Sequence, residues 1–216
     1  MKALIVAPHP DDEVLGVGGT ILKYKKLGHS IGWLIITKTE KELDWNNNQI
    51  KKREEELKLI QSFFNFDSVF NLNLPTTKLD SLPFSDIVIK ISKVLETFKP
   101  TELFIPHLGD IHSDHQIVHR ATLSCTKWFR HPYIKKTLAY ETLSETDLGE
   151  VFFPNVFIDI SNFLDLKIKA MKVYKSEMKS FPFPRSAEAI KALAKFRGSS
   201  SGFKAAEAFK LIKERI

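Results

Sequence analysis

Two short polar segments, 9–13 and 107–115, contain most of the residues in this 216-residue chain that could carry out hydrolytic chemistry. The first reads His-Pro-Asp-Asp-Glu, and the second ends in His-Ser-Asp-His. Imidazole nitrogens and carboxylate oxygens are ligands that zinc accepts, and a catalytic zinc site uses three protein ligands with a position left for water. The two segments together therefore indicate a hydrolytic site built on a divalent metal.

The metal ligands are expected to come from both segments. His9 and Asp12 are three residues apart on a tight turn, so one imidazole and one carboxylate can face the same point. His115 is the candidate for the third ligand. Segment 113–116 has the serine-to-glutamine spacing of a capping box, which predicts a helix that begins at residue 114 with His115 in its first turn. The positive helix end should disfavour an imidazolium there and leave a lone pair for the metal.

The remaining polar residues of the two segments match the other tasks of hydrolysis. Asp11 is adjacent to a predicted ligand and is expected to accept a proton from the attacking water. His112 is expected to face the developing oxyanion, with Asp114 orienting its imidazole and holding it protonated. His107 ends a predicted strand, and His119 lies one helical turn beyond the third ligand. We expect His119 in the core or next to the metal ligands, and we expect His107 to line the pocket without a role in the chemistry.

These segments depend on a sheet to bring them together. Short apolar runs predict strands at 2–7, 31–37, 68–74, 102–106, 137–141 and 156–160. Helical patterns alternate with them, from the glycine-bearing turn to about residue 27 and at 45–64, 84–98 and 114–129. This alternation favours a Rossmann-like three-layer α/β sandwich with a mostly parallel sheet. Ligands bind beyond the carboxyl ends of such strands, which is where both polar segments fall.

The last quarter of the chain has a different pattern. Helical periodicity predicts helices at 163–174, 187–196 and 203–216, separated by loops rich in proline or in serine and glycine. We expect one domain over 1–216, with a helical C-terminal part over about 161–216.

Composition narrows the class of protein. The sequence has no apolar run of the ~18 residues that a transmembrane helix needs and no signal peptide at its start, so we expect a cytoplasmic protein. The single cysteine, Cys125, excludes an intramolecular disulfide. The formal charge of +6 fits solubility or attraction of an anionic substrate. The basic residues at 51–53 are followed at once by three glutamates, so no nucleic-acid partner is expected.

Two motifs resemble those of a known family. Segment 7–13, Ala-Pro-His-Pro-Asp-Asp-Glu, with the glycines that follow at 16, 18 and 19, resembles the signature of the PIG-L/LmbE-like zinc deacetylases. Segment 112–115 resembles their second motif, His-Pro-Asp-His, with Ser113 in place of the proline. Serine can cap a helix, so we expect this exchange to leave the structure of the motif almost unchanged.

The resemblance implies removal of an acetyl group from the nitrogen of an amino sugar or amino-sugar conjugate, with release of acetate. It implies Zn²⁺, or another divalent metal such as Fe²⁺, a small N-acetylated sugar as the substrate, and a homo-oligomer, since bacterial relatives are often oligomeric. It also implies Asp11 as general base, and His112 paired with Asp114 in stabilising the tetrahedral intermediate. The implied metal ligands are His9, Asp12 and His115.

The resemblance extends to two other places. Arg53, with Glu56 three residues on, matches the family's Arg-x-x-Glu helix. Arg53 also falls on an apolar stripe where an unpaired charge would be costly, so it is either paired with a carboxylate or directed at the substrate. Segment 197–209 resembles the family's closing segment, with Phe203 near a position where the family often has tyrosine. Phenylalanine cannot donate the hydrogen bond that a tyrosine would.

Three other functions are compatible with parts of the sequence. A dinucleotide-binding oxidoreductase is disfavoured because Ile21 stands where a third glycine belongs and the acidic residues at 11–13 would repel a pyrophosphate. A non-catalytic sugar-binding member of the family would be expected to lack Asp11. An amidase that acts on a thiol-sugar conjugate is the closest alternative, because it would use the same chemistry.

Overall fold

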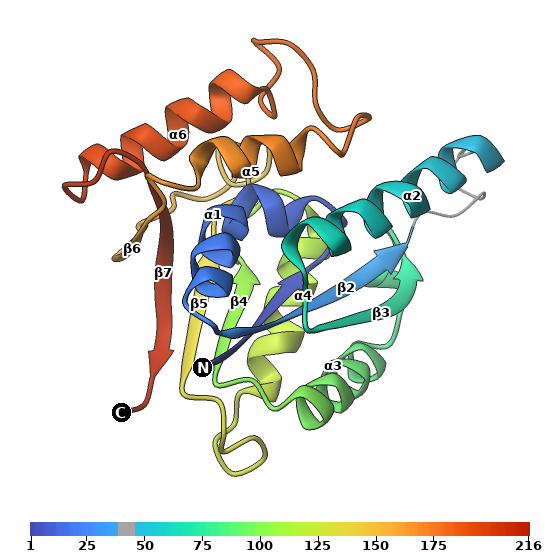
Figure 1. The fold of residues 1–216 in the computed structure, drawn as a ribbon. Coiled ribbons are helices and arrows are strands. Elements are labelled where there is room, and N and C mark those ends of the chain that lie inside the picture. The colour runs from blue at the N-terminus through green and yellow to red at the C-terminus, as the bar shows by residue number, and fades with distance from the viewer. Residues whose placement is uncertain (39–45) are drawn as a thin grey trace.

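The computed structural model describes residues 1–38 and 46–216, which include a seven-stranded sheet in the order β3-β2-β1-β4-β5-β7-β6. The predicted three-layer α/β sandwich is confirmed (Figure 1). The strands are β1 (Lys2–Ala7), β2 (Ser30–Lys38), β3 (Ser68–Pro75), β4 (Glu102–Pro106), β5 (Lys136–Tyr140), β6 (Val156–Asp159) and β7 (Ala206–Glu214). The helices are α1 (Asp12–Lys26), α2 (Asn47–Phe64), α3 (Phe84–Phe98), α4 (Ser113–Cys125), α5 (Leu164–Met171) and α6 (Ala187–Ser199), with a 3₁₀ turn, η2 (Leu79–Ser81).

The five strands β1 to β5 are parallel to one another, and their central members are apolar because helices cover both sheet faces. Side chains alternate between the two faces along β1. Ile5 packs into the core on the side of α1, α2, α5 and α6. Leu4 packs into the opposite core, against α3 and α4. None of the helices in the described ranges has the length and apolar character that crossing a bilayer requires.

The central pair of strands positions both polar segments. β1 lies beside β4 in parallel register, with Ile5 opposite Phe104. Their carboxyl ends therefore meet at one edge of the sheet, where 8–11 leads into α1 and 107–112 leads into α4. α4 begins at Ser113, one residue earlier than predicted, and ends at Cys125 instead of residue 129. The predicted start of α2 at residue 45 lies outside the described residues; the helix is capped by Asn46.

The prediction of a helix over 203–216 is wrong. This segment forms β7, which inserts between β5 and β6 and pairs with both in antiparallel fashion. Ala, Glu, Lys and Leu favour helices locally, but the free edge of β5 and the buried position of Glu207 outweigh that preference. The Glu207 carboxylate accepts hydrogen bonds from the backbone of Gly19 and Thr20, at 2.8 and 2.7 Å, and pairs with Lys167. The C-terminal part is therefore helical only in α5 and α6.

Candidate active site

The turn between β1 and α1 is held in a strained conformation. Asp11, the N-cap residue of α1, has φ of 118°, which is rare for a residue other than glycine. Such strain costs about 1–3 kcal/mol and persists only where the surroundings enforce it. Here the backbone N–H of Asp11 donates to the carboxylate of Glu13 at 3.0 Å. Glu13 is fully buried and also accepts a hydrogen bond from the hydroxyl of Tyr174 at 2.7 Å.

The three predicted metal ligands come together at this edge of the sheet. His9, Asp12 and His115 each offer one ligand atom, and all three atoms lie within 4.8 Å of one another. Asp12 Oδ2 lies 3.3 Å from His115 Nε2 and 3.6 Å from His9 Nδ1. Bonds of about 2.0–2.1 Å at tetrahedral angles would separate ligand atoms by roughly 3.3 Å. The donor types and their spacing therefore fit a tetrahedral divalent cation.

A carboxylate faces the second ring nitrogen of each histidine in this set. His115 Nδ1 lies 2.8 Å from Asp110, whose other oxygen accepts a hydrogen bond from Thr146 at 2.6 Å. His9 Nε2 lies 2.9 Å from Asp114. Carboxylates in this position orient metal-binding imidazoles and make them stronger ligands. Asp110 and Thr146 were not predicted, although Asp110 lies inside the second polar segment.

The same carboxylates determine protonation when no metal is bound. Burial lowers the pKa of His115, but Asp12 and Asp110 oppose it and raise that pKa to about 10. Burial likewise lowers the pKa of His9, and Asp114 and Asp12 raise it to about 9. In the metal-free chain these two carboxylates therefore outweigh the effect that was expected from the end of α4 and favour the imidazolium at His115.

Contrary to the expectation from the sequence, the Asp114 carboxylate does not orient the His112 imidazole. The Asp114 carboxylate contacts His9 and accepts a hydrogen bond from the Thr77 backbone at 2.7 Å. Only the Asp114 backbone N–H reaches His112, donating to Nδ1 at 3.1 Å, so the imidazole itself caps α4. Burial, followed by the charges of His9 and His115, lowers the pKa of His112 to about 4. A neutral ring with Nδ1 as acceptor carries its proton on Nε2, where it can donate to a ligand.

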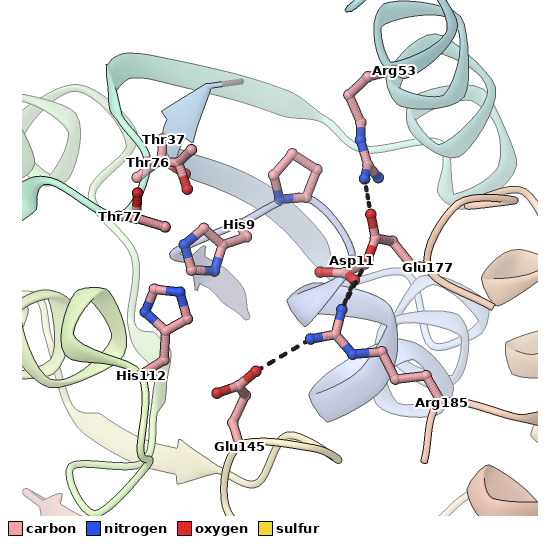
Figure 2. A pocket seen from close by; sticks show the side chains of 11 residues that line it. His9, Asp11, Thr37, Arg53, Thr76, Thr77, His112, Glu145, Glu177 and Arg185 are labelled. Atoms are coloured by element: carbon pink, nitrogen blue, oxygen red, sulfur yellow. Dashed lines mark hydrogen bonds and ion pairs between the residues drawn. The ribbon is translucent and has the colours of Figure 1, made fainter. Parts of the chain in front are cut away.

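A cavity of about 420 Å³ opens beside these residues, and Figure 2 shows the side chains that line it. Asp11 and His112 both lie on its wall. The Asp11 carboxylate accepts a hydrogen bond from Arg185 Nη1 at 2.7 Å. Burial raises the pKa of Asp11 to about 7, although the Arg185 guanidinium opposes that rise. No pattern in the sequence pointed to Arg185, which lies in a proline-containing loop far along the chain.

Arg53 is paired with carboxylates, as predicted, and it also lines the cavity where a substrate would bind. It is buried on α2 and forms ion pairs with Glu177 and, at 3.4 Å, with Glu56. The predicted salt bridge is therefore confirmed. Arg53 also lines the cavity, close to the Glu177 side chain that faces Arg185 (Figure 2). Contact with a substrate stays a prediction.

The weaker histidine candidates lie outside the ligand set. His119 is buried, and its Nδ1 donates to the Pro106 carbonyl at 2.8 Å. His107 packs edge-to-face against Phe152, with ring centroids 5.0 Å apart. His119 therefore lies in the core, one of the two places expected for it, whereas His107 is not among the described residues that line the cavity. Phe203 is 40% exposed, and the described residues that line the cavity include no tyrosine.

Comparisons with known proteins show which family and which solved structures this chain is similar to. The profile of the PIG-L family, described as GlcNAc-PI de-N-acetylase, matches residues 4–126. Diacetylchitobiose deacetylase of Thermococcus kodakarensis is 24% identical over 98% of this chain and 83% of its own length. A probable N-acetyl-alpha-D-glucosaminyl L-malate deacetylase 2 of Bacillus cereus is 25% identical over 81% of this chain and 82% of its own length. The crystal structure of a conserved protein from Thermus thermophilus superposes with a TM-score of 0.81, at 27% identity, covering 99% of this chain and 96% of that one.

Proposed function

The chain belongs to the PIG-L family, and we propose that it is a metal-dependent hydrolase that removes the acetyl group from the nitrogen of an amino sugar or amino-sugar conjugate. The observation that carries this proposal is the convergence of His9, Asp12 and His115 next to a cavity that His9, Asp11 and His112 line. The relatives named as deacetylases of N-acetylated sugars support the substrate class.

The metal would be held by His9, Asp12 and His115. Two imidazoles and one carboxylate suit Zn²⁺, which is the metal that we propose, and imidazole also suits Fe²⁺. When bound, such a cation supplies Lewis acidity that lowers the pKa of water and polarises an amide carbonyl. Asp110 and Asp114 hold the second nitrogens of the two imidazoles and so fix the direction of their lone pairs.

The residues of the cavity wall carry the proton and the developing charge. Asp11 accepts a proton from water as the water oxygen bonds to the acetyl carbon. His112 donates a hydrogen bond from Nε2 to the oxyanion of the tetrahedral intermediate. Asp11 then delivers its proton to the amine nitrogen as the C–N bond breaks, which yields acetate and the free amino sugar. His112 acts here as a neutral donor, in contrast to the protonated imidazole expected from the sequence.

The charges that line the cavity favour an uncharged sugar. Among its described lining residues, the carboxylates of Asp11, Glu145 and Glu177 face the guanidiniums of Arg53 and Arg185. Both arginines are already paired with these carboxylates, so neither offers its full charge to a phosphate. The net charge of +6 is therefore a poor guide to the substrate, because the excess lies elsewhere on the chain.

The test is acetate release by the zinc-loaded protein from N-acetylglucosamine, diacetylchitobiose and a nucleotide-linked N-acetyl sugar. We expect acetate with the uncharged substrates and slower release with the nucleotide-linked one. An amidase would instead cleave a larger acyl conjugate without releasing acetate, and a sugar-binding protein would bind the substrates without turnover. Acetate from none of the three, with zinc at one equivalent, would refute the proposal.

A further inference from the structure

One arginine joins the catalytic turn to a loop that is remote in sequence. Arg185 lies in the loop before α6, 174 residues from Asp11, and its Nη1 donates to Asp11 Oδ2 at 2.7 Å. Asp11 is 3% exposed. Among residues 1–38 and 46–216, Arg185 is the residue whose side chain donates a hydrogen bond to the Asp11 carboxylate. The bond engages Oδ2 and does not involve the second carboxylate oxygen, Oδ1.

The guanidinium itself is held on several sides, as Figure 2 shows for its carboxylate partners. Its Nε donates to Ser144 Oγ at 2.9 Å, and its Nη2 donates to Glu145 at 3.2 Å. Glu177 accepts a further bond from Nη1 at 3.2 Å. A planar group fixed by four contacts has little freedom to rotate, so it can impose a direction on Asp11.

We propose that Arg185 is a positioning residue that sets the orientation of the Asp11 carboxylate. This inference rests on the proposed function, in which Asp11 moves the proton. The backbone of Asp11 is held from one side by Glu13, and its side chain is held from the other by Arg185. With Oδ2 engaged by Arg185, Oδ1 is the oxygen that would accept the proton from water and pass it to the leaving nitrogen. Displacing a catalytic group by about 1 Å can cost about 100-fold in rate.

The test compares Arg185→Met with a matched control, Arg197→Met. Arg197 is exposed to a similar extent, 16% against 18% for the side chain, and it donates two hydrogen bonds to Glu141, at 2.8 and 2.6 Å. The control therefore removes an arginine–carboxylate contact of similar length that does not reach Asp11. Arg185→Lys is the conservative variant, because lysine keeps the charge but loses the planar fork.

For Arg185→Met we expect kcat to fall by about 100-fold or more, with zinc stoichiometry and melting temperature close to those of Arg197→Met. KM should change by less than about 3-fold, because the loss concerns the reaction step. Arg185→Lys should recover part of kcat. In crystal structures of both proteins, the Asp11 carboxylate should be displaced in Arg185→Met and unchanged in Arg197→Met.

The inference is overturned if Asp11 keeps its position in Arg185→Met, or if kcat there stays within about 3-fold of the control. Loss of zinc or of the fold in Arg185→Met alone would also overturn it, because Arg185 would then support the whole site. If the parent protein releases no acetate from any substrate, the proposed function fails. The position of Asp11 in the two crystal structures still decides the inference in that case.

Discussion

Replacing Asp110 with asparagine should weaken metal binding without touching a metal ligand. Asp110 is fully buried, and its carboxylate faces His115 Nδ1 at 2.8 Å. Asparagine keeps the shape of the side chain but removes the charge that makes the imidazole a stronger ligand. Loss of such a partner typically costs about 10- to 100-fold in metal affinity, which equals about 1.4–2.8 kcal/mol.

The size of this loss should depend on pH. In the metal-free chain Asp110 also raises the pKa of His115, so protons compete with the metal below about pH 10. Asp110→Asn lowers that pKa and relieves the competition, which offsets part of the lost affinity at neutral pH. We therefore expect the full loss of about 10- to 100-fold only above about pH 10, a smaller loss at pH 9 and the smallest loss at pH 7.

The assay is competitive titration of zinc against a chelator at both pH values. Thr146→Val serves as the graded control, since it removes only the 2.6 Å hydrogen bond that Thr146 donates to Asp110 and leaves the charge in place. It should give a smaller loss at either pH. A loss of zinc affinity in Asp110→Asn that does not grow from pH 7 to pH 9 would refute the role of Asp110.

Three further predictions concern turnover, pH and packing. Asp11→Ala should keep one equivalent of zinc and lose at least about 100-fold in kcat, measured by acetate release; full turnover would remove Asp11 from the mechanism. The metal-free protein should melt at a lower temperature at pH 10 than at pH 6.5, because folding raises the pKa of His9 to about 9 and that of His115 to about 10. The stability that these two imidazolium groups contribute is fully present below pH 6.5 and is lost as the pH rises through the raised pKa values. A melting temperature that rises from pH 6.5 to pH 10 in scanning calorimetry would contradict those pKa values. Gly16→Ala should destabilise the fold by about 1–3 kcal/mol in urea unfolding, since its Cβ would overlap the buried Tyr140 ring; an unchanged midpoint would show that the ring can move away.

The central strands and the convergence of His9, Asp12 and His115 could be predicted because their signals are local. A short apolar run followed by a polar turn marks both β1 and β4, and the rules for parallel sheets bring their carboxyl ends together. The ligand residue types then follow from the coordination preferences of zinc. His9 and His115 accordingly lie side by side, with ring centroids 5.3 Å apart.

The features that could not be predicted depend on long-range pairing. The segment that forms β7 has helix-favouring residues, and its pairing with β5 and β6 makes it a strand. Arg185 reaches Asp11 across 174 residues, and no spacing pattern in the chain records such a contact. Asp114 was assigned to His112 because the two are near in sequence, whereas its carboxylate reaches His9, 105 residues away.

An anomalous difference map from crystals grown with zinc tests the proposed metal site most directly. We predict one strong peak about 2.0–2.2 Å from ligand atoms of His9, Asp12 and His115, next to the cavity. The side chains of His9, His112 and Asp114 also bring ligand atoms within 4.8 Å of one another. A single zinc peak at that second set, with none between Asp12 and His115, would contradict the proposed ligands.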